Sequence, residues 1–167
     1  MFSKIFPKIH VEGYKFLVIS GIITIVFYIF SDFLALLGLL LTIWVYYFFR
    51  DPERITIDDD NYLVSPADGE VIKVEEVDGP KELNLENKRF RKISIFMNVF
   101  DCHVNRTPCA GKIEEILYKP GKFLNASFDK ASEDNERNYY KIKDNQNNDI
   151  ILVQIAGLVA RRICLLY

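Results

Sequence analysis

The residues best suited to chemistry follow an apolar stretch near the middle of the chain. Ile93–Val99 is rich in β-branched and aromatic residues, which is typical of a buried strand. His103 comes just after it and is one of only two histidines in the sequence. An imidazole that titrates near neutral pH can act as a general base or a general acid. The polar residues of this run are Asp101, His103, Asn105, Arg106 and Thr107.

Two neighbours of His103 and one earlier carboxylate also invite chemical interpretations. Cys102 and Cys109 flank His103, but their spacing fits no standard zinc pattern, so we predict no metal site. Asp68 lies in Ser65–Gly69, where Asp-Gly is an ordinary signal for a hairpin turn. On local signals alone, that turn would join strands at Tyr62–Val64 and Glu70–Val77.

Composition limits the class of protein. The chain has 167 residues and a formal net charge of -2, which gives no reason to expect a nucleic-acid partner. Its three cysteines form no disulfide framework, so we expect a reducing compartment and no disulfide.

The first third of the chain predicts a membrane anchor. Residues 1–15 form a short basic amphipathic arm, and Phe16–Phe30 and Phe33–Phe49 contain no charged residue. A turn at Ser31 and Asp32 would make them a transmembrane hairpin, with Asp32 capping the second helix. Basic residues on both sides of the hairpin place both ends in the cytoplasm. A buried helical pair in a soluble core is the less favoured alternative.

The rest of the chain predicts short strands. Gly111–Tyr118 is one of them, and Tyr139–Lys143 and Ile150–Ile155 pair across an asparagine-rich turn. We therefore expect an α+β protein. Residues 1–54 would form the arm and the hairpin anchor, and residues 55–167 a small, mostly antiparallel β-rich domain of sandwich or barrel type on the cytoplasmic side. The long segment Lys122–Asn138 has aromatic residues first and ionic residues later, which favours a substrate loop over disorder.

Several motifs in order resemble one family. They are Phe49-Arg50-Asp51-Pro52, Ser65-Pro66-Ala67-Asp68-Gly69, Phe96–Pro108, Lys122-Phe123-Leu124-Asn125-Ala126, Ala131–Asn138 and Gln154–Arg162. The chain resembles the short bacterial and archaeal form of phosphatidylserine decarboxylase over nearly its whole length.

The resemblance implies a lyase of phospholipid biosynthesis in the cell (inner) membrane, made as a proenzyme. A serine in a Gly-Ser motif cleaves the chain, and the small α subunit then begins with a covalent pyruvoyl cofactor. Its ketone bonds to the amine of phosphatidylserine and accepts electrons as CO2 leaves, which yields phosphatidylethanolamine. Asp68 and His103 match the family's catalytic residues, and a homodimer is compatible with the resemblance. We expect substrate contacts at Phe123, Arg106, Asn135 and Arg137, although Arg137 could equally be a solvated surface charge.

Two departures from the family qualify this interpretation. The longer bacterial form has a second histidine three positions after the first, where this chain has Arg106, so His103 would serve two steps or Arg106 would act electrostatically. The sequence also contains no Gly-Ser dipeptide. We therefore predict that it is truncated, makes no pyruvoyl group and is inactive alone.

Two other functions fit parts of the pattern. A membrane-tethered barrel-sandwich domain of a sugar phosphotransferase system could use His103 as a phosphate carrier, although the hairpin argues against it. A degenerate, non-catalytic binding module would explain the missing serine.

Overall fold

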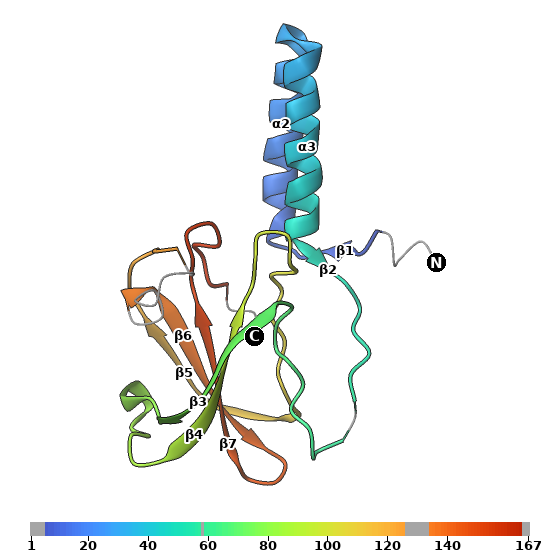
Figure 1. The fold of residues 1–167 in the computed structure, drawn as a ribbon. Coiled ribbons are helices and arrows are strands. Elements are labelled where there is room, and N and C mark those ends of the chain that lie inside the picture. Colours follow the sequence, from blue (N-terminus) through green and yellow to red (C-terminus); the bar gives the residue numbers. More distant parts are fainter. Residues whose placement is uncertain (1–5, 58, 126–133, 165–167) are drawn as a thin grey trace. The chain divides into compact units, whose positions relative to one another are not determined.

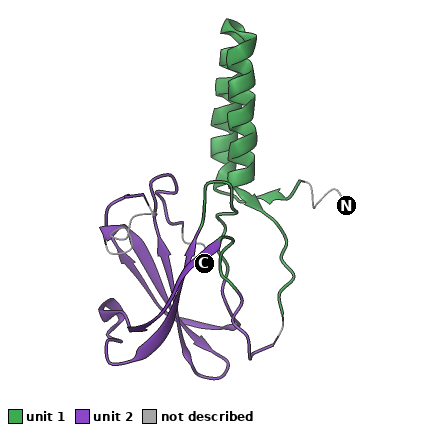
Figure 2. Cartoon of the chain, in the orientation of Figure 1, with its two compact units in different colours: residues 1–57, 65–69, 97–106 green, residues 58–64, 70–96, 107–167 purple. Residues whose placement is uncertain are grey.

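The structure is a computed structural model that describes residues 6–57, 59–125 and 134–164. These described residues form two α-helices and three small antiparallel sheets (Figure 1), which confirms the α+β class. The chain forms two compact units (Figure 2). The first unit comprises residues 1–57, 65–69 and 97–106, and the second comprises residues 58–64, 70–96 and 107–167. The first unit thus holds the predicted anchor and also two loops from later in the sequence.

The first unit is built on a helical hairpin. Helix α2 spans Gly13–Phe30 and helix α3 spans Asp32–Phe48, so the predicted break is confirmed. Ser31 between them is extended, and its hydroxyl accepts a hydrogen bond from the Phe33 amide at 3.3 Å. The expectation that Asp32 caps the second helix was wrong: Ser31 is the cap and Asp32 is the first helical residue. The serine hydroxyl reaches the free amides of the first turn, as N-caps do.

The two helices pack closely through small and polar residues. A side chain at Gly38 would lie 2.9 Å from the Thr24 Cα atom, so glycine lets the backbones approach. The hydroxyls of Thr24 and Thr42 are hydrogen bonded at 3.1 Å. Most other side chains of the hairpin are apolar and exposed, unlike those of a core helix in a soluble protein. By length and composition α2 could cross a membrane, whereas α3, with 17 residues, is shorter than a typical span.

The N-terminal arm is tied to the end of the hairpin. Strand β1, Lys8–Ile9, pairs antiparallel with strand β2, Arg50–Asp51. The Tyr46 hydroxyl donates to the Pro7 carbonyl at 2.7 Å, and the rings of Phe16 and Phe49 stack with centroids 5.0 Å apart. The chain leaving α3 therefore starts from a fixed position.

The second unit contains two antiparallel sheets. Strand β3 (Glu70–Asp78) pairs with β4 (Arg89–Phe96), and strands β5 (Gly111–Lys119), β6 (Arg137–Asp144) and β7 (Asp149–Ile155) follow in that order. The predicted pairing of β6 with β7 is confirmed. The predicted strand at Tyr62–Val64 is wrong, and so is the hairpin turn at Asp68-Gly69, because β3 pairs with β4 and not with a preceding strand.

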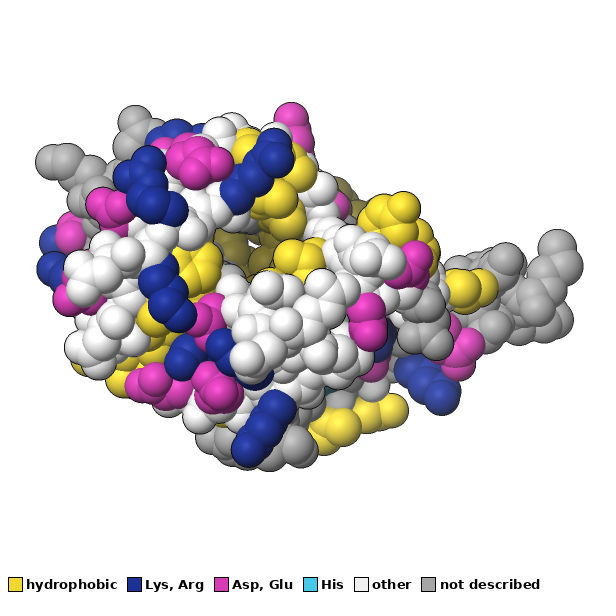
Figure 3. Space-filling model, turned by 90° about the horizontal axis from the view of Figure 1, so that it is seen from below, with side chains coloured by type: hydrophobic (Ala, Val, Ile, Leu, Met, Phe, Trp, Pro, Cys, Tyr) yellow, Lys and Arg dark blue, Asp and Glu magenta, His cyan; other side chains and the backbone are white. Residues whose placement is uncertain are grey.

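One small core joins these sheets. Leu83, which ends the short 3-10 helix η1 (Lys81–Leu83), is buried with Leu85 and with Tyr139 of β6. Phe90, Leu117 and Ile151 of β4, β5 and β7 pack against this cluster. Figure 3 shows acidic and basic side chains around the outside of one face, with apolar side chains gathered toward its middle. On β3, Val71 and Ile72 lie at a register shift in the pairing with β4 and are both exposed, so this strand presents apolar surface to solvent.

A buried carboxylate links the two sheets. Asp149 at the start of β7 accepts hydrogen bonds from Lys88 at 2.5 Å and from Lys143 at 2.7 Å. These bonds lower the pKa of Asp149 from 3.8 to about 2. Because the folded-state pKa is depressed, the stabilisation is present above about pH 3.8 and is lost as the pH falls toward 2.

We expect Asp149→Asn to lower stability at neutral pH and to flatten the loss of stability in acid. The free energy of unfolding of the full chain in detergent, followed by circular dichroism between about pH 5 and 2, tests this. Asp78→Asn is the control, because the Asp78–Arg89 ion pair is solvent-exposed. Equal acid sensitivity of Asp149→Asn and the unmodified chain would contradict the assignment.

Candidate functional site

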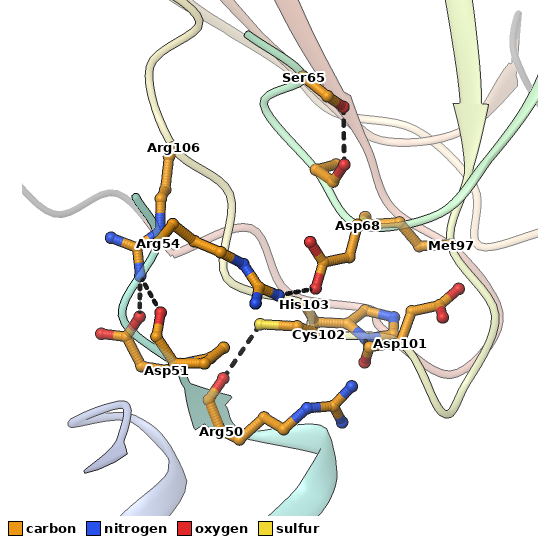
Figure 4. A network of polar contacts seen from close by, with 12 residues as sticks. Arg50, Asp51, Arg54, Ser65, Asp68, Met97, Asp101, Cys102, His103 and Arg106 are labelled. Carbon is orange, nitrogen blue, oxygen red and sulfur yellow. Dashed lines mark hydrogen bonds and ion pairs between the residues drawn. The ribbon is translucent and has the colours of Figure 1, made fainter. Parts of the chain in front are cut away.

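Within the first unit, two polar loops meet the segment that leaves α3. The loop of residues 65–69 carries Asp68, and the loop of residues 97–106 carries His103 and Arg106. The Arg106 amide donates to the Pro66 carbonyl at 2.9 Å, which joins the loops directly. The structure therefore brings three of the predicted site residues together in one unit (Figure 4).

His103 is held from two sides. Its Nδ1 atom lies 3.1 Å from the Asp101 carbonyl oxygen. The ring of Phe48, at the end of α3, stacks on the imidazole with centroids 4.1 Å apart and an angle of 22° between the planes. Burial lowers the pKa of His103 below its usual value. The Asp101 carbonyl and carboxylate oppose this shift, and the charge of Arg50 adds to it.

These contacts define the protonation state of the imidazole. A carbonyl oxygen only accepts hydrogen bonds, so in the contact with Asp101 it is Nδ1 that carries the proton. Nε2 then keeps its lone pair. Because the pKa is lowered, the neutral ring dominates at pH 7. His103 is therefore prepared to accept a proton at Nε2.

Asp68 has a different partner from the one that a catalytic dyad would require. Its carboxylate forms an ion pair with Arg54, three residues after β2 (Figure 4). Among the described residues, no hydrogen bond joins Asp68 to His103; the imidazole is oriented by the Asp101 carbonyl instead. Ser65 donates to the Ala67 carbonyl at 2.7 Å and stabilises the loop that carries Asp68.

The segment that leaves α3 also binds the loop of residues 97–106 through polar contacts. Arg106 forms an ion pair with Asp51 and donates to the Pro52 carbonyl at 2.9 Å. The Cys102 thiol donates to the Arg50 carbonyl at 3.1 Å, and burial raises the pKa of this thiol. Cys102 is therefore a buried structural thiol and not an activated nucleophile.

Asn135 belongs to the second unit, and its side chain forms hydrogen bonds with backbone groups of that unit. It is 1% exposed, and its amide nitrogen donates to the carbonyls of Leu124 at 2.9 Å and Ala156 at 2.8 Å. Its side-chain oxygen accepts from the Leu124 amide at 2.8 Å. These bonds fix the start of the predicted substrate loop. Asn135 would therefore affect substrate binding by positioning that loop and not by contacting the substrate.

Arg137, also in the second unit, is only 8% exposed, so the alternative that it is a solvated surface charge is wrong. Its Nε donates to the Asn135 carbonyl at 3.1 Å, and among the described residues its buried Nη2 has no hydrogen-bond partner. A buried guanidinium nitrogen without a partner is costly, and an anion would satisfy it. Phe123 is half-buried, and residues 126–133 of the predicted loop lie outside the described residues.

Comparison with known proteins identifies the family. The family model described as "Phosphatidylserine decarboxylase" matches residues 41–167. A "Phosphatidylserine decarboxylase proenzyme" of Pelagibacter ubique is 76% identical over 163 residues, which cover 98% of this chain and 76% of that protein. The chain belongs to the phosphatidylserine decarboxylase family. Proteins of the same name from Ruegeria pomeroyi and Cereibacter sphaeroides are 52% and 49% identical, and the chain covers 70% of each.

Family membership decides between the enzymatic alternatives. It identifies the chain as a phosphatidylserine decarboxylase, a lyase of phospholipid biosynthesis made as a zymogen, and not as a phosphotransferase component. The site of such a decarboxylase needs a proton acceptor and donor, and His103 has the matching tautomer and pKa direction.

Sequence reasoning missed the residues that position His103. Phe48 was assigned only to the hairpin, and no partner within the chain was predicted for Arg54, which pairs with Asp68. No local signal connects residues so far apart in the chain. The family motif Phe49-Arg50-Asp51-Pro52 was the available indication that this segment does more than end the hairpin.

We expect Phe48→Ala to raise the pKa of His103 toward its ordinary value, because water would then reach the imidazole face that the ring now covers. NMR titration of the imidazole protons measures this directly in the 167-residue chain. With only two histidines, a His10→Gln variant assigns the signals. Phe33→Ala, at the opposite end of α3, is the matched control. An unchanged pKa in Phe48→Ala would show that the ring does not shield His103.

Proposed function

We propose that this chain supplies the acid–base residues, the substrate-binding residues and the membrane anchor of an enzyme that converts phosphatidylserine to phosphatidylethanolamine. The observation that carries the proposal is His103 itself. Its Nδ1 is committed to the Asp101 carbonyl, its Nε2 is available, and its pKa is lowered.

The first step assigned to His103 is activation of the self-cleaving serine. These 167 residues contain no Gly-Ser dipeptide, so the serine is not among them. His103 Nε2 takes the proton of the serine hydroxyl as the oxygen attacks the preceding peptide carbonyl, and it returns this proton to the peptide nitrogen as the C–N bond breaks. The carboxylate of Asp68 stabilises the imidazolium that forms.

The second step returns a proton to the substrate. The pyruvoyl group of the α subunit, when present, supplies an electron-withdrawing carbonyl to the substrate amine. The neutral, partly shielded imidazole fits this chemistry, because it can take up a proton in one step and deliver it in the next. Nε2 takes up the proton that the substrate ammonium group loses, and His103 then delivers this proton to the carbon that has lost CO2. Arg106, held by Asp51, contributes positive charge to the same loop.

The substrate-binding residues of the second unit are Arg137, Asn135 and Phe123. The buried Nη2 of Arg137, which has no partner in the part of the chain that the structure describes, is the donor that we assign to the carboxylate or phosphate of the lipid headgroup. Asn135 holds the loop beside it through Leu124, and Phe123 adds apolar contact.

We further propose that the hairpin of α2 and α3 inserts into the cell membrane with both of its ends on the cytoplasmic side. The apolar surface of α2 and the basic residues around the hairpin support this orientation. Residues 1–54 would then be the anchor. Residues 55–167 would form the decarboxylase domain, in which two sheets share a core in sandwich or barrel fashion.

A chimera tests the function. The 167 residues are joined to the part of the Pelagibacter ubique relative outside the aligned region, where the family resemblance implies that the Gly-Ser motif lies. We expect the chimera to split into two chains and to release CO2 from vesicles containing phosphatidylserine. The 167-residue chain alone should do neither. A chimera that splits but leaves phosphatidylserine intact would contradict the substrate, and CO2 release by the chain alone would contradict the need for a separate serine.

A further inference from the structure

The loop that carries His103 lies beside the last turns of α3. The indole nitrogen of Trp44 donates to the Val99 carbonyl at 3.2 Å. Trp44 precedes Phe48, the last residue of α3, by four residues, which is about 6 Å along a helix at 1.5 Å per residue. Within the first unit, the loop therefore extends alongside the apolar hairpin and does not merely touch its end.

The tip of this loop is a fixed turn with an exposed aromatic side chain. Asn98 accepts from the Phe100 amide at 2.8 Å through its side chain, and the Asn98 amide donates to the Asp101 carboxylate at 2.8 Å. Arg50 donates to the Phe100 carbonyl at 3.0 Å. The backbone of Phe100 is therefore held on two sides while its side chain is 70% exposed. An aromatic ring held out from a rigid turn can contact a surface at little entropic cost.

The residues around this turn are of types that are common at the boundary between lipid and water. Trp44, Tyr46 and Tyr47 lie in the last turns of α3, and such aromatic residues concentrate at membrane interfaces. The Arg50 guanidinium lies 5.7 Å from the centre of the Tyr47 ring, where a cation can meet anionic headgroups. The turn is thus continuous with the surface by which the hairpin would meet the bilayer.

We propose that the turn Asn98–Asp101 is a membrane-contact element, with Phe100 inserted among the headgroups and upper acyl chains of the bilayer. The inference rests on the proposed function, in which the hairpin is in the membrane. It adds that the loop of the catalytic histidine also touches lipid. His103 follows Phe100 by three residues, so this contact holds the imidazole at the depth of the headgroups. A phosphatidylserine headgroup can then reach His103 while its acyl chains stay in the bilayer.

Tryptophan fluorescence in vesicles tests the proposal on the full 167-residue chain. The chain is reconstituted in vesicles of phosphatidylcholine and phosphatidylglycerol that contain lipids brominated near the headgroup or deep in the acyl chain. Trp44, the single tryptophan, reports whether the hairpin inserts. Phe100→Trp in a Trp44→Phe background reports the turn. Tyr62→Trp in the same background is the control, since Tyr62 is an exposed aromatic residue of the second unit.

The expected result is quenching of Phe100→Trp by the shallow bromolipid, with acrylamide quenching reduced at least about threefold relative to Tyr62→Trp. If Trp44 is quenched by lipid while Phe100→Trp behaves like Tyr62→Trp, the contact of the turn is excluded and the anchor stands. If Trp44 itself is not quenched, the proposed anchor fails and this inference fails with it.

Trp44→Phe removes the hydrogen bond to Val99 and could unfold the turn. A second measurement therefore uses the chain without substitutions near the turn. In the unmodified chain, lipids with a nitroxide on the headgroup should broaden the imidazole NMR signals of His103. A His103 signal that is unaffected by these lipids would overturn the proposal.

Discussion

His103→Gln is expected to slow self-cleavage of the chimera by at least about 100-fold. Glutamine retains a polar side chain of similar reach, but it cannot accept a proton near neutral pH. In the structure no other described histidine is available in the loop, and Arg106 at the third following position is an obligate cation paired with Asp51. The measurement is the fraction of chain cleaved with time, followed by gel electrophoresis.

The matched control is His10→Gln, in the N-terminal arm, which should cleave at the unmodified rate. Any His103→Gln chimera that does cleave slowly separates the two roles of the imidazole. CO2 release per cleaved molecule should fall again by a large factor if His103 also returns the proton to the substrate. Cleavage at the normal rate would show that His103 does not activate the serine. Normal CO2 release per cleaved molecule would show that His103 does not return the proton to the substrate.

The sequence predicted the elements that depend on local patterns. Two uncharged runs separated by Ser31 and Asp32 became a helical hairpin, and the turn between β6 and β7 was marked by its asparagines. The pairing of β3 was missed, because Glu70 pairs with Phe96, far along the chain, whereas Asp68-Gly69 gave a strong local turn signal. Strand partners that are distant in sequence are decided by packing, which local propensity does not contain.

The candidate site was likewise predictable only where it depended on local sequence motifs. The family motifs singled out Asp68 and His103, and the structure places both in the first unit. Their immediate partners depend on tertiary structure. The stacking of Phe48 on His103 and the pairing of Arg54 with Asp68 each join the exit of α3 to a later loop. The burial of Arg137 was equally invisible in its sequence context of Asn135-Glu136-Arg137-Asn138, which is as polar as a surface loop.

Asp68→Asn is expected to slow self-cleavage of the chimera by about 10- to 100-fold, while Arg54→Gln should change the rate by less than about threefold. The reason is the positive charge that His103 gains during the reaction. When His103 takes the serine proton it becomes an imidazolium, and a nearby carboxylate stabilises that charge, whereas asparagine does not. Arg54 neutralises the same carboxylate in the structure, so removing Arg54 leaves Asp68 free to serve the imidazolium.

The double variant distinguishes a catalytic carboxylate from a structural ion pair. If Asp68 acts on His103, Arg54→Gln combined with Asp68→Asn should be as slow as Asp68→Asn alone. The pH at which cleavage reaches half its maximum should also fall in Asp68→Asn, because loss of the carboxylate further disfavours the protonated imidazole. Equal losses in both single variants, with an unchanged pH profile, would instead mean that the Arg54–Asp68 pair only holds the loop of residues 65–69 in place.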